Sequence, residues 1–201
     1  MAYYYLVAQL PSLSYGQAAP MASGAFKDLC QTALTPEDAA LLELCTLDPW
    51  EVSGDGKKAV QVPEFFEKWY AWERTLRLNL ARYRSARVKR DVPADVTDHP
   101  ADAAAAAKAA SVLDSPLEAE IFLDEARWKA IEAYQGLDYF DRNTVYAYLL
   151  KLLLMERRSA FRAEEGFAEY KGLYAAVMEA AGDGAAMGLK SQTSTESGEP
   201  K

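Results

Sequence analysis

The clearest pattern of hydrophobic and polar positions begins after Pro63 and has the period of an α-helix. Apolar side chains recur there at intervals of one, three or four residues, at Phe65, Phe66, Trp69, Trp72, Leu76, Leu80 and Tyr83. Such a stripe is typical of an amphipathic helix with one face in a protein core. The pattern predicts a helix that runs to about Lys89 and stops before Pro93.

A second long helix is predicted to start at Asp141 or Asn143, and it could continue through Met178. Residues 145–155 carry apolar side chains on opposite sides of this helix, which is typical of a helix buried on both faces. Lys151 interrupts that stretch. Its ammonium group therefore needs an acidic partner or a path to solvent.

Helix start signals predict shorter helices around these two. Ser23 can cap a short helix that runs through Cys30. Residues 35–38 read Thr-Pro-Glu-Asp, which combines a capping residue, an early proline and acids near the positive end of the helix dipole. Residues 115–118 read Ser-Pro-Leu-Glu, a capping box for a helix to about Tyr134.

The predicted fold class is mostly α, a two-lobed bundle of long helices with a short N-terminal extended segment. The extended segment covers residues 3–10, where aromatic and branched side chains favour a strand-like conformation. The predicted parts of the chain are an N-terminal helical lobe, a linker with an alanine-rich connector, a C-terminal helical lobe and a disordered tail, at 1–90, 91–114, 115–181 and 182–201.

Composition limits the chemistry that the chain can perform. Cys30 and Cys45 are too few for a disulfide framework, and with His99 as the single histidine a zinc site is nearly excluded. The usual glycine-rich phosphate loops are absent. Several helical carboxylates, including Glu73, are interpreted as members of solvated faces. The sequence therefore gives no candidate catalytic, metal-binding or cofactor-binding residue, and no small-molecule substrate.

The distribution of charge gives the strongest indication of a partner. The chain has a formal net charge of −8, which disfavours a general nucleic-acid binder, yet residues 74–90 hold seven positive charges and no acid. Arg77 and Arg84 fall on one flank of the apolar stripe, whereas Arg82 and Lys89 fall on the other. The charges therefore bracket a buried stripe instead of forming one broad phosphate-facing surface.

Arginine favours bidentate contact with carboxylates, so this segment suits acidic groups. Three interpretations remain open: pairing with the chain's own acids, docking onto an acidic protein partner, or binding of nucleic acid or an anionic membrane. The candidate partner-binding residues are Arg77, Arg82, Arg84, Arg87, Lys151, Glu156 and Arg157.

Two segments resemble the C subunit, also called d or AC39, of V-type and archaeal-type rotary ATPases. Residues 78–87 read Leu-Asn-Leu-Ala-Arg-Tyr-Arg-Ser-Ala-Arg, similar to the family's Asn-Leu followed by an arginine-rich stretch. Residues 148–151 read Tyr-Leu-Leu-Lys and precede Glu156 and Arg157, similar to its terminal lobe. Residues 1–11 resemble a small bacterial family associated with V-type ATPase gene clusters, whose members stand in for the C subunit.

The resemblance implies a non-catalytic adaptor between the central stalk and the membrane ring of a rotary motor that transports ions such as protons. It implies a cytoplasmic protein that is peripheral to the membrane through partner subunits, with no direct membrane insertion, no cofactor and no nucleic-acid partner. The alternatives are a transient assembly or regulatory factor of the same complex, or a nucleic-acid-binding helical module.

Overall fold

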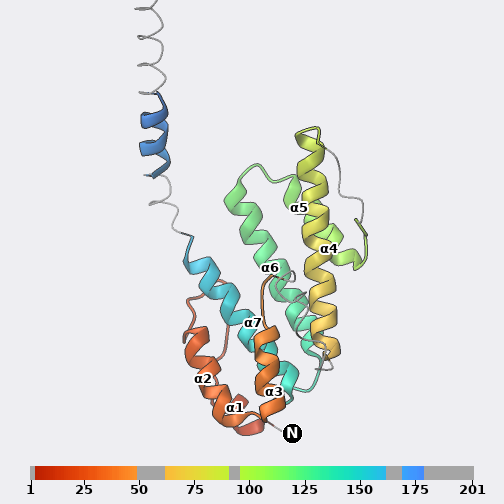
Figure 1. The fold of residues 1–201 in the computed structure, drawn as a ribbon, viewed down its shortest axis with the longest axis vertical. Helices are drawn as coiled ribbons and strands as arrows, with labels where there is room; N and C mark the ends of the chain where they lie inside the picture. The colour runs from red at the N-terminus through yellow and green to blue at the C-terminus, as the bar shows by residue number, and fades with distance from the viewer. Residues whose placement is uncertain (1–2, 49–61, 91–95, 162–168, 179–201) are drawn as a thin grey trace, which may run out of the picture. The chain divides into compact units, whose positions relative to one another are not determined.

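The computed structural model describes residues 3–48, 62–90, 96–161 and 169–178 (Figure 1). All regular structure in these ranges is helical, which confirms the predicted mostly-α fold class. The chain divides into two units, Met1–Ser159 and Ala160–Lys201. The helices of the first unit are α1 (Tyr4–Gln9), α2 (Ser23–Ala33), α3 (Pro36–Leu41), the 3₁₀ turn η1 (Leu42–Leu44), α4 (Glu64–Arg87), α5 (Ala101–Ser111), α6 (Pro116–Gln135) and α7 (Arg142–Ser159).

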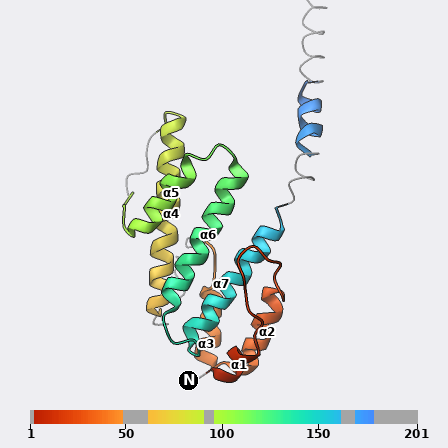
Figure 2. The ribbon, with the colours of Figure 1, turned by 180° about the vertical axis from the view of Figure 1, so that it is seen from behind.

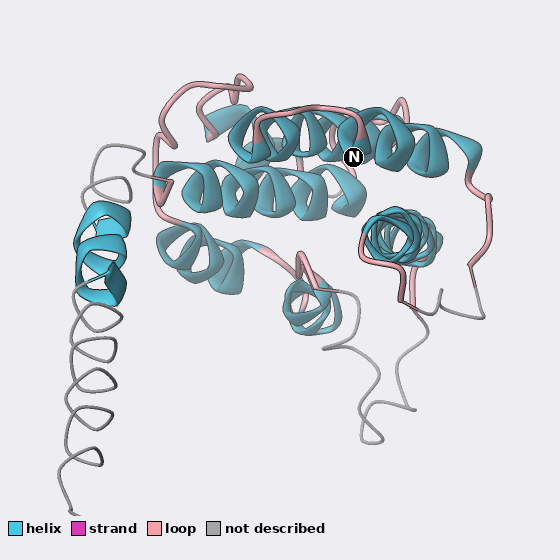
Figure 3. Ribbon diagram, turned by 90° about the horizontal axis from the view of Figure 1, so that it is seen from above, coloured by secondary structure: helices cyan, strands magenta, loops and turns pink. Residues whose placement is uncertain are grey.

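Helix α7 lies at the centre of the first unit. It contacts α6 on one side and α2 on another, and α6 in turn contacts α4 and α5. Both ribbon views show α7 between α6 and α2 (Figure 1, Figure 2), and Figure 3 shows helices joined by loops. The apolar stretch of α7 is buried as predicted, and Val145, Leu149, Leu150 and Leu152 are fully shielded from solvent.

Helix α4 forms close to where the hydrophobic pattern predicts it. Glu64 and Glu67 occupy its first turn and Arg84 and Arg87 its last, an arrangement that favours the helix dipole at both ends. Helix α4 ends at Arg87, and Lys89 just beyond it adopts a left-handed backbone conformation with φ of 53°.

The alanine-rich segment predicted as a connector is the helix α5, and it belongs to the core. Ala103, Ala106, Ala107 and Ala110 are buried, and the helix contacts both α4 and α6. Alanine has little surface to bury, but its small side chain allows close approach of neighbouring helices, where dispersion contacts accumulate. The chain divides after Ser159, and the separation of lobes 1–90 and 115–181 by a linker stays a prediction.

The N-terminal segment is a helix, α1, so the predicted extended conformation of residues 3–10 is wrong. Tyr3, Leu6, Val7 and Leu10 have the spacing of one helical face, and all four lie on the core. The Tyr3 hydroxyl also donates a hydrogen bond to the Asp38 carboxylate. These tertiary contacts outweigh the strand preference of the individual residues.

Three of the predicted helix starts are confirmed by their hydrogen bonds. The Thr35 hydroxyl accepts from the backbone N–H of Asp38 at 3.2 Å, and the Ser115 hydroxyl accepts from that of Glu118 at 3.3 Å. The Asp141 carboxylate accepts from the backbone N–H of residue 144 at 3.0 Å, at the start of α7. Gly136, with φ of 84°, follows the end of α6 as predicted.

The second unit is described at residues 160–161 and 169–178, and the latter range is helical. The predicted continuation of the last helix through Met178 is interrupted, because α7 ends at Ser159. The predicted tail at 182–201 lies outside the described residues. In the described part of the chain, no helix combines the length and the apolar character needed to cross a membrane.

Both cysteines are buried and free, which leads to a test of core integrity. Burial raises the pKa of the Cys30 thiol from 9.0 to about 12, so the folded chain holds roughly a thousandfold less thiolate there than the unfolded chain. We expect a thiol reagent at pH 8 to label native protein very slowly and denatured protein at once. Reaction rates with and without denaturant measure this, and fast labelling of native protein would contradict it.

Candidate functional site

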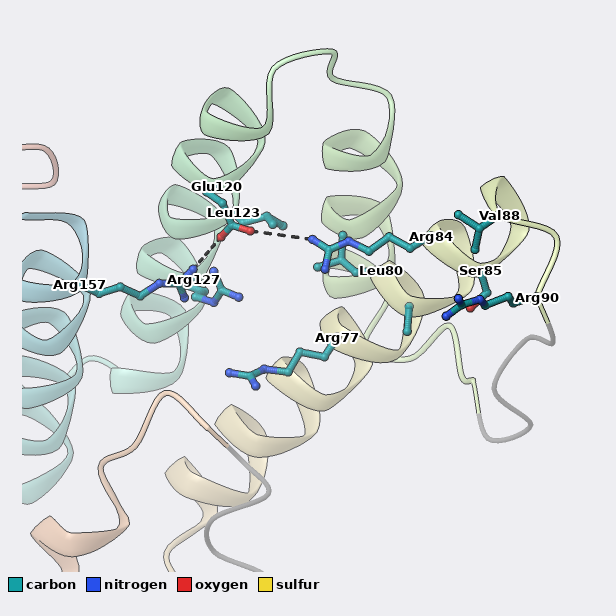
Figure 4. A pocket seen from close by; sticks show the side chains of 11 residues that line it. Arg77, Leu80, Arg84, Ser85, Val88, Arg90, Glu120, Leu123, Arg127 and Arg157 are labelled. Atoms are coloured by element: carbon teal, nitrogen blue, oxygen red, sulfur yellow. Dashed lines mark hydrogen bonds and ion pairs between the residues drawn. The ribbon is translucent and has the colours of Figure 1, made fainter. Parts of the chain in front are cut away.

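An open groove of about 700 Å³ lies along α4 and α6, and α7 contributes Arg157 to its edge (Figure 4). We call it the arginine groove, because five guanidinium groups line it together with a single acidic residue, Glu120. These arginines are Arg77, Arg84, Arg90, Arg127 and Arg157. In the close view Arg77 and Arg84 extend from α4 toward α6, so one flank of the basic helix faces the groove.

Beneath the groove is a buried layer of charge in which each described group has a partner. The Glu73 carboxylate is completely shielded from solvent and accepts two hydrogen bonds from Arg127, at 3.0 and 3.1 Å. Arg77 donates to the same carboxylate at 2.8 Å, and Arg127 also donates to Asp124 at 2.9 Å. Buried charges are tolerated only with such complete pairing, so this layer holds α4 and α6 in fixed register.

Arg157 extends the charged layer to α7. Its guanidinium lies 3.7 Å from the Asp124 carboxylate and 2.6 Å from that of Glu120. Burial raises the pKa of Asp124 above its usual range, and the positive charges of Arg157 and Arg127 oppose that rise. Three helices therefore meet through ionised side chains at the base of the groove.

The rim of the arginine groove is held less firmly than its base. The Arg84 guanidinium lies 3.9 Å from the Glu120 carboxylate, and the Arg84 side chain is 71% exposed. Pairs of this kind contribute little to stability because water screens them. Arg84 can therefore contact an external anion without disturbing the fold.

Apolar side chains also line the groove beside its charges. Leu80 and Leu123 are buried at its lining, and Val88 is exposed near the end of α4. A groove with arginines and apolar side chains suits a ligand that carries a carboxylate next to an apolar group. In the described part of the chain, no cluster of three or more potential metal ligands occurs.

Of the seven candidate partner-binding residues, three come together at the arginine groove: Arg77, Arg84 and Arg157. Arg77 has a structural role there, because it also donates to the Leu47 carbonyl at 2.6 Å and lies 3.4 Å from the Asp48 carboxylate. Arg84 and Arg157 share Glu120.

Arg82 lies on the other flank of α4, where it holds the segment before α5. Its guanidinium is 3.4 Å from the Asp98 carboxylate, and Asn79 beside it donates to the Thr97 carbonyl at 2.8 Å. Arg87 donates to the Ser111 carbonyl at the end of α5. The Arg82 contact matches the interpretation in which basic side chains pair with the chain's own acids, whereas Arg87 contacts a backbone carbonyl.

Lys151 and Glu156 also make contacts inside the first unit. The Lys151 ammonium lies 3.1 Å from the Glu132 carboxylate and 4.9 Å from the centre of the Trp128 ring. Glu132 is therefore the acidic partner that the sequence predicts for Lys151. Glu156 accepts from the Ser23 backbone N–H at 2.6 Å and from its hydroxyl at 2.7 Å. The α7 carboxylate therefore caps α2, and Ser23 does not act as the predicted cap.

The sequence interpretation missed the buried charges. The predicted position of Glu73 on a solvated face is wrong, because its side chain is fully buried. A signal was present: Glu73 follows Trp69 by four residues, and Arg127 follows Leu123 and precedes Ile131 by four residues each. A charged residue in phase with an apolar stripe indicates a buried ion pair, but the sequence does not name its partner.

Models of known protein families, curated proteins and solved structures gave no match to this chain. The resemblance of residues 78–87 and 148–151 to a rotary-ATPase subunit therefore stays a prediction from the sequence. The geometry adds one fact about it: Arg84, inside the first segment, and Arg157, just after the second, meet at the same carboxylate.

Proposed function

We propose that this protein is a non-catalytic adaptor subunit of a V/A-type rotary ATPase, similar to the C subunit, that couples the central stalk to the membrane ring. One observation carries the proposal. The two segments that resemble the C subunit lie on different helices, α4 and α7, and Arg84 within the first and Arg157 shortly after the second both contact Glu120 in the arginine groove. A docking surface is the feature that an adaptor requires.

An adaptor of this kind transmits torque, so its helices must move together under load. The buried contacts of Glu73, Asp124 and Arg127 join α4 to α6, and Arg157 joins α7 to the same cluster. This cross-linking supports a stiff body behind the groove. Charge complementarity between the groove and an acidic surface of the stalk would fix the orientation of the partner more than its affinity.

Purification of the complex from native membranes tests the proposal. We expect a tagged copy of the full chain to retain the rotary-ATPase subunits in a constant ratio through successive columns. Retention in a small and variable amount would instead support the alternative of an assembly or regulatory factor. Recovery of the chain with none of those subunits would contradict both.

A further inference from the structure

We infer that the arginine groove binds an acidic, amphipathic helical segment of a partner protein, and that a carboxylate of this segment replaces Glu120 as the partner of Arg84. The inference rests on the proposed function and names the chemistry of the partner. It also assigns Glu120 a role as the internal group that occupies the site until the partner arrives.

The first argument is that the groove already holds a carboxylate. Glu120 lies between two guanidinium groups that come from different helices, as the dashed lines in Figure 4 show. Its two oxygens face Arg157 at 2.6 Å and Arg84 at 3.9 Å. The spacing of these arginines therefore fits a carboxylate that enters along α4.

The second argument is that the two contacts of Glu120 differ in strength. The contact with Arg84 is long and solvent-exposed, so a carboxylate placed closer to Arg84 competes with it easily. Arg157 keeps Asp124 as a second partner at 3.7 Å if Glu120 moves. Arg127 stays paired with Glu73 beneath the groove, so the exchange leaves the buried layer intact.

The third argument decides between a protein and a nucleic acid. The exchange of Glu120 frees one carboxylate-sized place beside Arg84, which fits a single side-chain carboxylate better than a run of phosphates. Leu80 and Leu123 line the same space but are buried, whereas Val88 at its end is exposed and offers an apolar side chain that a partner can contact. These surfaces suit an apolar side chain one helical turn away from a carboxylate, the pattern of an amphipathic acidic helix.

Binding of a defined probe to the full chain tests the inference. The probe is a fluorescent synthetic helical peptide in which two glutamates, one turn apart, flank a leucine, and its twin carries glutamine in their place. We expect the acidic peptide to bind and the twin to bind far more weakly, as measured by fluorescence anisotropy. Arg84→Gln should weaken binding about tenfold, whereas Lys129→Gln, which removes an exposed, paired cation elsewhere on α6, should not.

The competing role of Glu120 has its own readout. Glu120→Gln removes the internal carboxylate and should strengthen peptide binding several-fold, whereas Glu118→Gln makes the same charge change on an exposed position of α6 and should leave it unchanged. Weaker binding in Glu120→Gln would overturn the exchange. Circular dichroism of each variant confirms that the helices are retained.

Several results would overturn the inference as a whole. These are equal binding of the glutamine twin, no binding at about 1 mM peptide, or no effect of Arg84→Gln. Tighter binding of a single-stranded oligonucleotide through Arg84 would assign the groove to nucleic acid instead. If the peptide fails while the chain still copurifies with a rotary ATPase, the adaptor role stands and the assignment of the groove falls.

Discussion

Replacing Arg127 with methionine should lower the free energy of unfolding by about 3–5 kcal/mol. Methionine fills much of the space, but it leaves Glu73 without its bidentate partner and Asp124 without its closest one. Both carboxylates are almost fully shielded from solvent, so water cannot replace the lost hydrogen bonds. Urea denaturation at pH 7, followed by circular dichroism, measures the change.

Lys129→Met is the matched control for this variant. Lys129 is an exposed cation on the same helix and pairs with Glu125 at 2.7 Å, so its loss should change stability by no more than about 0.5 kcal/mol. Adding Glu73→Gln to Arg127→Met should recover part of the loss, because one of the unpaired buried charges disappears. A free energy of unfolding for Arg127→Met within about 1 kcal/mol of the original would show that the buried layer does not hold the helices together.

The sequence predicts the long helices well because their signals act over short distances. The apolar period of α4 and the capping box of α6 involve residues that lie within one or two turns of each other. Residues 3–10 show the opposite case. Their aromatic and branched side chains favour a strand, but α1 forms because Tyr3 and Leu6 pack into a core built by later parts of the chain.

The candidate site was predictable only in part, for a related reason. The helical wheel places Arg77 and Arg84 on one flank of α4, and both line the arginine groove. Their partners could not be read from the sequence, since Glu120 follows Arg84 by 36 residues and Arg127 follows Glu73 by 54. Which acid meets which arginine depends on how α4, α6 and α7 pack, and α5, whose alanines gave little signal, sets part of that packing.

The arrangement of the basic residues sharpens the prediction for charge reversal. The resemblance to the C subunit implies that Arg82→Glu, Arg84→Glu or Arg87→Glu uncouples ATP hydrolysis from ion transport. Arg82 is engaged with Asp98 and Arg87 with the Ser111 carbonyl, whereas Arg84 is an exposed cation at the rim of the arginine groove. Of the three charge reversals, Arg84→Glu should therefore weaken partner contact most and disturb the fold least.

In a complex that carries Arg84→Glu, we expect ATP hydrolysis to continue while ATP-driven ion transport falls about tenfold or more. The new carboxylate repels Glu120 and an acidic partner together, and like charges at an interface cost several kcal/mol. Transport into sealed vesicles, divided by the hydrolysis rate of the same sample, measures coupling, with Lys129→Glu as the matched reversal away from the groove. Coupled pumping unimpaired by Arg84→Glu would count heavily against the adaptor role, because a docking arginine cannot change sign without weakening the contact that carries torque.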